Sequence, residues 1–142
     1  MSVHICPFSS FFSAIAVIGR IERVNQLIEK SITPTFKEYG LSNIEFDILA
    51  TMRRNATPLT PTELYRSLML SSGAVSTRIE QLVKRGFIER QYNQEDRRSC
   101  HVALTDLGIE LIDSAFSKHV NNEKGLLAPL TTLEQTQLAT LL

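Results

Sequence analysis

The sequence contains few of the residues from which catalytic and metal sites are built. Its 142 residues include two cysteines, three histidines and no tryptophan. Cys6 and Cys100 lie far apart and match no metal-ligand spacing, and no Ser-His-Asp order, phosphate-binding loop or nucleotide fingerprint is present. The sequence therefore predicts that the protein is not an enzyme and that it uses no cofactor or metal.

Long apolar runs are missing as well. No stretch approaches the roughly 20 apolar residues that span a bilayer. The segment Phe8–Ile18 is apolar and contains Ala14-Ile15-Ala16, which has the form of a signal-peptidase site, but no Lys or Arg precedes it and serines interrupt it. We expect a reduced, cytoplasmic protein without a secretory signal or a membrane partner.

The sequence has no excess of charge of one sign, since fifteen Lys and Arg balance fifteen Asp and Glu. The charges are nevertheless distributed unevenly. Between Ser71 and Arg98 six basic residues stand against four acidic ones, whereas from Cys100 onward two basic residues stand against five acidic ones. A local basic region is sufficient for binding a DNA duplex, because phosphate attraction is screened beyond about 10 Å. A solvated surface of mixed charge explains the same imbalance, so charge alone does not distinguish a DNA-binding surface from an ordinary one.

The N-terminal part of the sequence reads as one long helix. Over Phe8–Tyr39 apolar residues recur at helical spacing. These residues are Val17, Ile21, Val24, Ile28 and Ile32. Pro34 is expected to kink this helix near its end, and Gly40 to terminate it.

Two capping boxes mark the helices that follow. Ser42 is followed three residues later by Glu45, and Thr60 by Glu63, with a proline directly after Thr60. In this pattern the first side chain accepts from the backbone of the third following residue, whose carboxylate accepts in return. The two boxes predict helices over Ile44–Asn55 and Pro61–Leu68.

A third helix and a hairpin follow. The helix is predicted from Ser71 to Gly86, with a buried stripe at helical spacing. The stripe consists of Val75, Ile79, Leu82 and Val83. Phe87–Gln91 reads as a short strand, Tyr92–Ser99 as a polar loop and His101–Leu104 as the returning strand.

Thr105 is expected to cap a further long helix, and Thr131 with Glu134 to open a last one that reaches Leu142. The stripe of the long helix consists of Gly108, Leu111, Ile112, Ala115 and Phe116. The fold class is therefore mainly α, a winged helix-turn-helix with N- and C-terminal dimerisation helices. We expect a dimerisation helix in residues 1–40, a DNA-binding module in 41–104 and further dimerisation helices in 105–142.

The helix that begins at Ser71 has the features of one that enters the major groove. Its start is slim, so its backbone can approach base edges, and its first amides favour phosphate. A surface helix with a small-residue start is the alternative explanation. The predicted DNA-binding residues here are Ser71, Ser72, Gly73, Ser76, Thr77 and Arg78. Their hydroxyls and guanidinium are donors suited to bases and phosphates.

The polar loop carries a second predicted contact at Asp96, Arg97 and Arg98. An arginine at the tip of a hairpin can enter a narrow minor groove, where the negative potential is deepest. A carboxylate two residues away can hold its guanidinium in a bidentate pair. A solvated charged turn is the alternative, and the preceding helix is what favours DNA contact.

The segment Asp96–Gly108 fits the pattern D-x-R-x-x-x-V-x-L-T-x-x-G, which is the wing and following helix start of the MarR family (multiple antibiotic resistance regulators). Matching segments precede it in the same order at Leu41–Phe46, Leu59–Leu64 and Gln81–Ile88. The sequence thus resembles that family over about Leu41–Phe116. The resemblance implies a homodimer on palindromic double-stranded DNA, and a repressor released by a small, often aromatic or anionic, effector.

The residues themselves also favour a dimer, because both chain ends are rich in apolar residues that a single chain would leave exposed. These are Phe8, Phe11, Phe12, Leu126, Leu127, Leu130 and Leu133. The sequence does not identify the residues that bind the effector. Arg20, Arg23, Arg53 and His119 are candidate anion partners, although surface ion pairing is the commoner role. The tryptophan that urate-sensing members of the family use is absent.

Two alternatives to an effector-released repressor remain. Cys6 precedes a helix start that would stabilise a thiolate, and Cys100 adjoins the wing, so thiol-based redox sensing is one. A DNA-binding architectural protein without a sensor is the other. Salt-dependent binding without sequence preference would favour the architectural role over the regulatory one.

Overall fold

The computed structural model describes residues 9–55, 57–92 and 100–142, with side chains from residue 14 onward. This part of the chain is mainly helical, with one small sheet. The elements are α1 (Ser9–Glu38), α2 (Asn43–Asn55), α3 (Pro61–Leu68), α4 (Ser72–Lys84), β1 (Ile88–Tyr92), β2 (Cys100–Leu104), α5 (Asp106–Leu127) and α6 (Thr132–Leu141). Their order confirms the predicted fold class, a mainly α winged helix-turn-helix with long terminal helices.

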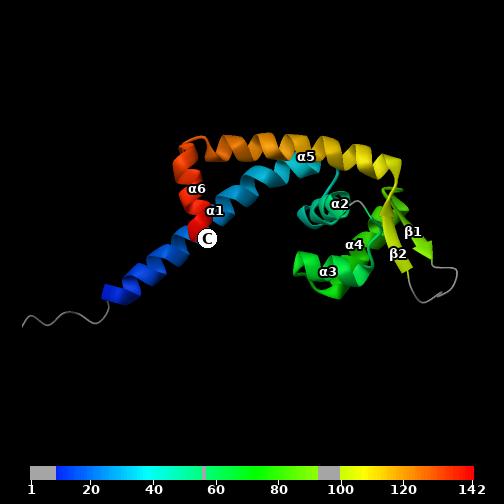
Figure 1. Ribbon diagram of the computed structural model, residues 1–142, viewed down its shortest axis with the longest axis horizontal. Coiled ribbons are helices and arrows are strands. Elements are labelled where there is room, and N and C mark those ends of the chain that lie inside the picture. The colour runs from blue at the N-terminus through cyan, green and yellow to red at the C-terminus, as the bar shows by residue number, and fades with distance from the viewer. Residues whose placement is uncertain (1–8, 56, 93–99) are drawn as a thin grey trace, which may run out of the picture.

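The helices fall into two regions (Figure 1). α2, α3, α4 and the β1–β2 hairpin cluster beneath the N-terminal end of α5, while the C-terminal half of α1 runs beside α5. The N-terminal half of α1 extends away from the cluster, and α6 folds back at the far end of α5. α1 continues through Pro34 as one helix.

The capping predictions are confirmed. Ser42, Thr60 and Thr131 each form a reciprocal box with the glutamate three residues on. Thr105 caps α5 by accepting from the Gly108 amide at 3.1 Å. These bonds satisfy backbone donors that the first turn of a helix leaves without a partner, so local sequence alone sets where four of the helices begin.

The end of α4 differs slightly from the prediction. The helix ends at Lys84, with Ser71 as its N-cap and Arg85 as its C-cap, rather than continuing to Gly86. Gly86 takes a φ of +77°, and the Phe87 amide bonds back to the Leu82 carbonyl at 3.0 Å. Because this left-handed closure uses the Phe87 amide, β1 starts one residue later than predicted.

The hairpin is antiparallel, with Ile88 opposite Leu104 and Tyr92 opposite Cys100. Leu59, just before α3, adds an isolated bridge to Val102, with amide–carbonyl distances of 3.0 and 2.8 Å in the two directions. This bridge fixes the base of the hairpin to the start of the helix-turn-helix. The loop at 93–99 lies outside the described residues.

One core joins both regions. Its buried members include Phe36 from α1, Ile48 and Leu49 from α2, Leu64, Val75, Ile79, Leu82, Ile88, Val102, and Ile112 and Ala115 from α5. Most residues of the predicted α4 and α5 stripes are therefore buried. Phe116 is a correction, since 50% of it is exposed although its ring stacks on Phe46 at 6.4 Å. It lies at the edge of the α2–α5 contact, where the stripe leaves the core.

A large apolar surface remains on the terminal helices of the single chain. It comprises Ile15, Val17, Ile18, Ile21, Val24 and Leu27 of α1, with Leu126, Leu127, Leu133, Leu138, Leu141 and Leu142 near the C-terminus. Of the residues predicted for mutual burial, Phe8, Phe11 and Phe12 have no described side chains. Among the described residues no helix is both long and apolar enough to cross a bilayer.

Candidate nucleic-acid interface

α4 lies between α2 and the hairpin, and buries only one of its faces. Val75, Ile79 and Leu82 point into the core, whereas Gly73 and Thr77 on the opposite side are exposed. The exposed face contains no large apolar side chain. Such a face has little surface with which to bind another protein but keeps donors and acceptors available to a polar ligand.

The N-terminal turn of α4 is as slim as the sequence predicts. Ser72 and Gly73 are exposed, and a Cβ added to Gly73 would meet no atom within 4 Å. The Ser71 hydroxyl accepts from the Ala74 amide at 3.3 Å, which leaves other first-turn amides to point outward. Amides and the positive end of the helix dipole together favour an anion such as phosphate.

The predicted side chains of α4 differ in how available they are. The Thr77 hydroxyl donates to the Gly73 carbonyl at 3.0 Å, and Arg78 is half-buried with its guanidinium donating to Gln81 at 2.9 Å. Ser72 and Ser76 are exposed and make no hydrogen bond through their hydroxyls within the described part of the chain. These two serines are therefore the most accessible of the predicted groups.

The turn between α3 and α4 is tight. Met69 takes a left-handed conformation, φ 53° and ψ 32°, and caps α3, while the Leu70 amide bonds to the Tyr65 carbonyl at 3.2 Å. Met69 is 93% exposed, so its side chain contributes nothing to the core. A non-glycine residue in this region carries a backbone cost. The turn places the end of α3 directly before the exposed start of α4.

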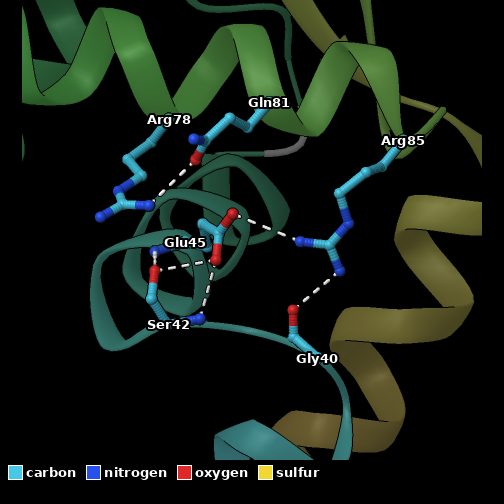
Figure 2. Close-up of polar contacts among 6 residues, drawn as sticks. All are labelled: Gly40, Ser42, Glu45, Arg78, Gln81 and Arg85. Atoms are coloured by element: carbon cyan, nitrogen blue, oxygen red, sulfur yellow. Dashed lines mark hydrogen bonds and ion pairs between the residues drawn. The ribbon is translucent and has the colours of Figure 1, made fainter.

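Two side chains of α4, Arg78 and Gln81, and that of its C-cap, Arg85, face the beginning of α2 (Figure 2). Arg85 donates to the buried Glu45 carboxylate at 3.3 Å and to the Gly40 carbonyl at 2.8 Å. The other oxygen of Glu45 accepts from the backbone and hydroxyl of Ser42, each at 2.8 Å. Arg78 and Gln81 lie on the same side of the helix. Both oxygens of the buried carboxylate are thus hydrogen-bonded, which removes the cost of burying an unpartnered charge.

The opposite flank of α4 contacts the hairpin. Arg90 of β1 donates to Glu80 at 2.8 Å and approaches the Cys100 sulfur at 3.8 Å. The hydrogen bonds that Arg90 donates to Cys100 and Glu80 raise the pKa of Arg90 above its usual value. The guanidinium therefore stays charged and joins α4, β1 and β2 at one point.

The predicted wing residues Asp96, Arg97 and Arg98 all lie outside the described residues. Sequence reasoning missed Glu45, Glu80, Arg85 and Arg90 as members of the site. Their partners lie 10 to 45 residues away in sequence. The single local signal was the Ser42–Glu45 box, which located Glu45 without indicating its contact with α4.

Two of the four candidate anion partners are engaged with acids. Arg53 forms a bidentate pair with Asp113, at 2.8 and 3.0 Å, which lowers the pKa of the aspartate. His119 packs beside the stacked pair of Phe36 and Phe46, 5.1 and 5.0 Å from their ring centres, with Nε2 3.2 Å from Glu123. Arg20 and Arg23 are exposed on α1. Among the described residues no group of three or more His, Cys, Asp and Glu is placed to hold a metal ion.

A short helix, a tight turn and a second helix, followed by a two-stranded hairpin, define the winged helix-turn-helix class of DNA-binding proteins. The MarR family model matches residues 39–99. The regulator PecS of Dickeya dadantii is 38% identical over 128 residues, which is 89% of this chain and 77% of PecS. MarR of Escherichia coli is 30% identical over 106 residues, 74% of this chain and 73% of MarR.

Solved structures agree. A mutant of E. coli MarR in complex with operator DNA is 28% identical, covers 92% of this chain and 94% of its own, and superposes with a TM-score of 0.78. A probable transcriptional regulator from Pseudomonas aeruginosa is 26% identical, over 87% of this chain and 92% of its own, with a TM-score of 0.76. The chain belongs to the MarR family and is a DNA-binding transcriptional regulator.

Proposed function

We propose that the chain acts as a homodimer that binds a palindromic operator and represses transcription until a small effector releases it. In this proposal α4 reads the major groove through Ser71, Ser72, Gly73, Ser76, Thr77 and Arg78. Asp96, Arg97 and Arg98 of the wing supply the second contact. The single observation that carries it is the exposed, slim and polar face of α4, whose other face is fixed in the core.

The dimer is supported by the terminal helices. Ile18 is 65% exposed and Leu133 67%, within an apolar surface that a lone chain has no means of covering. Burying it against a second copy would use residues 1–40 and 105–142 for dimerisation and 41–104 for DNA. The core does not stop at those boundaries, because Phe36 and Ile112 belong to it. A movement between the two subunits would therefore be transmitted to the DNA-binding module.

Selection of bound sequences from a random duplex pool, with purified protein, tests the proposal. We expect an enriched palindrome whose half-sites lie about one helical turn apart, roughly 34–36 Å. Affinity for it should exceed that for random duplex by about a thousandfold or more. Salt-dependent binding without any enriched sequence would replace the regulator with an architectural protein, and the absence of duplex binding would refute both.

An effector site is proposed at the junction of α2 and α5. A cavity of about 390 Å³ there is lined by Ala50, Arg53, Arg54, Ile112, Asp113 and Phe116. Arg53 is already paired with Asp113 there, so its apolar residues together with the Arg54 guanidinium are what suit an aromatic anion. Titration of salicylate or benzoate into the protein–operator complex should release DNA at millimolar concentrations or below, and cyclohexanol serves as the uncharged control. Release by both compounds alike would remove the anion preference.

Thiol sensing is the second candidate. Cys100 is half-buried beside Arg90, whose charge would favour a thiolate. E. coli MarR has been solved in a reduced and an oxidized form, with TM-scores of 0.73 and 0.73 to this chain. Peroxide should release operator from the wild type but not from a Cys6→Ser, Cys100→Ser double variant. Unchanged binding by the oxidised wild type excludes this candidate.

A further inference from the structure

The junction between α1 and α2 is closed by a side chain from α4. α1 ends in a left-handed turn, in which Gly40 has a φ of +65° and the Leu41 amide bonds to the Phe36 carbonyl at 3.0 Å. The Gly40 carbonyl is left pointing outward, and Arg85 donates to it at 2.8 Å. The C-terminal end of α4 is thereby tied to the C-terminal end of α1 (Figure 2).

The same guanidinium is fixed on its other sides. Its second terminal nitrogen contacts Glu45 at 3.3 Å, and its central carbon lies 4.9 Å from the centre of the Phe87 ring. Glu45 is itself held by Ser42 at the start of α2. Arg85 therefore has a defined orientation, because three separate groups restrain a planar, multi-donor head.

Hydrogen bonds of Ser31 with Asn122 and of Tyr39 with the Ser114 carbonyl hold α1 against α5, whereas its ring packing on α2 is apolar. Phe36 of α1 stacks on Phe46 of α2 with centroids 4.1 Å apart and planes at 19°. The geometric preference of such an aromatic pair is worth only about 0.5–1.5 kcal/mol beyond area burial, and the burial itself has no direction. Hydrogen bonds do have a direction. Among the described residues, Arg85 makes the hydrogen bonds that join α4 to this junction.

We infer that Arg85 is a positioning residue that sets the angle between α4 and the dimerisation helix α1, and so fixes the half-site spacing that the dimer accepts. The inference rests on the proposed dimer and on α4 as its reading helix. In a two-fold dimer joined through α1, the angle between α1 and the DNA-binding module sets the separation of the two α4 helices, so an angular change at Gly40 alters that separation. Arg85 then acts on specificity without touching DNA.

The test is an operator series in which half-site spacing is changed by one and two base pairs. Wild type should bind one spacing best, with a clear loss on either side. Arg85→Met should bind that best spacing about tenfold more weakly, the size of effect expected for a lost hydrogen bond between charged groups, and should discriminate little between spacings. Its dependence on salt should stay unchanged, because no phosphate contact is removed.

Lys84→Met is the matched control. It removes the same charge one residue earlier on α4, from an exposed side chain. We expect the spacing profile of this control to match wild type, whatever happens to its overall affinity. Arg85→Lys, which keeps the charge and can still reach one acceptor, should restore part of the discrimination. A loss in Arg85→Met that is equal at every spacing, or a lower salt slope, would overturn the inference.

A distance measurement without DNA tests the positioning role separately from operator affinity, and thermal unfolding shows whether the variant still folds. A spin label at Ser67→Cys on exposed α3, in a Cys6→Ser, Cys100→Ser background, reports the distance between the two DNA-binding modules of a dimer. Arg85→Met should broaden or shift that distance distribution while thermal unfolding still shows one folded transition. An unchanged distribution refutes the positioning role. If wild type binds no duplex or forms no dimer, both the proposed function and the inference fail. If wild type binds duplex and forms a dimer, the results with the Arg85 variants test the inference separately from the proposed function.

Discussion

Arg90 of β1 and Glu80 of α4 form a 2.8 Å ion pair that joins the hairpin to the helix beside it. The side chains remain 33% and 50% exposed, so water screens the pair. Pairs of this kind contribute about 0.2–1 kcal/mol to folding. A contact that weak for stability can still matter for binding, if it holds the hairpin at the angle at which both elements reach the same duplex.

A double-mutant cycle of Glu80→Gln and Arg90→Gln separates these two roles. In urea unfolding we expect a coupling free energy of about 0.2–1 kcal/mol that shrinks as salt is added. In operator binding we expect a larger coupling free energy between the two substitutions. Glu80→Gln alone should weaken binding, although it removes a negative charge near DNA. Tighter binding by Glu80→Gln would mean that the pair does not position the hairpin.

Arg98→Ala should weaken binding to specific and random duplexes alike. Loss of one phosphate-type contact lowers the slope of log affinity against log salt by about one unit. Gel shifts over a salt series measure this slope, and Lys124→Ala, a charge change on exposed α5 far along the chain, is the control. Arg98 has no part in the mechanism if both affinity and slope persist.

Ser76→Ala and Arg78→Ala should each reduce operator affinity by roughly 1–3 kcal/mol, if each side chain reads a base edge. For Arg78 the Gln81 side chain supports the guanidinium at 2.9 Å, so Gln81→Ala should reproduce part of the loss. Affinities for operator and random duplex, compared variant by variant, check this. An equal loss on both sequences would reduce the residue to a contact that positions the helix on the phosphates.

Glu63 links stability to pH. The backbone amide and the hydroxyl of Thr60 donate to its carboxylate, and these bonds hold its pKa below the usual 4.5. A lowered folded-state pKa contributes stability above the unfolded value, and this stability is lost as pH falls through the folded value. Glu63→Gln should therefore unfold at lower urea than wild type at neutral pH. The difference should shrink as the pH falls below 4.5 and disappear once the pH lies below the lowered pKa of the folded state. Glu110→Gln, an exposed site on α5, is the control.

Two glycines of α5 should respond in opposite ways to alanine. A Cβ at Gly108 would lie 2.1 Å from the Phe87 carbonyl oxygen, whereas one at Gly125 meets nothing within 4 Å. Gly108→Ala should thus destabilise the protein by about 1–3 kcal/mol or more, because α5 is pushed from the hairpin. Gly125→Ala should stabilise it by up to about 1 kcal/mol. Thermal or urea unfolding measures both, and a neutral Gly108→Ala would show that α5 can shift freely.

Local residue patterns were enough to predict where four of the helices begin, and they placed the end of α4 within two residues. The boxes at Ser42, Thr60 and Thr131 are complete within three residues, and Gly86 ends a helix by its own conformational freedom. Such signals depend on atoms that neighbouring residues always bring together, so they can be read without knowing the fold. The order of these elements then indicated a winged helix-turn-helix, and the identity of its exposed serines followed from helical spacing.

The side chains that hold the elements at their angles became visible once the helices and the hairpin were seen packed together. Arg85 and Gly40 are 45 residues apart, and Glu80 and Arg90 meet only because a hairpin packs beside α4. Nor did helical spacing show that Phe116 stays half-exposed or that His119 packs beside a stacked pair of phenylalanine rings. Contacts of this kind arise after several helices have packed together, so no local pattern of residues can specify them.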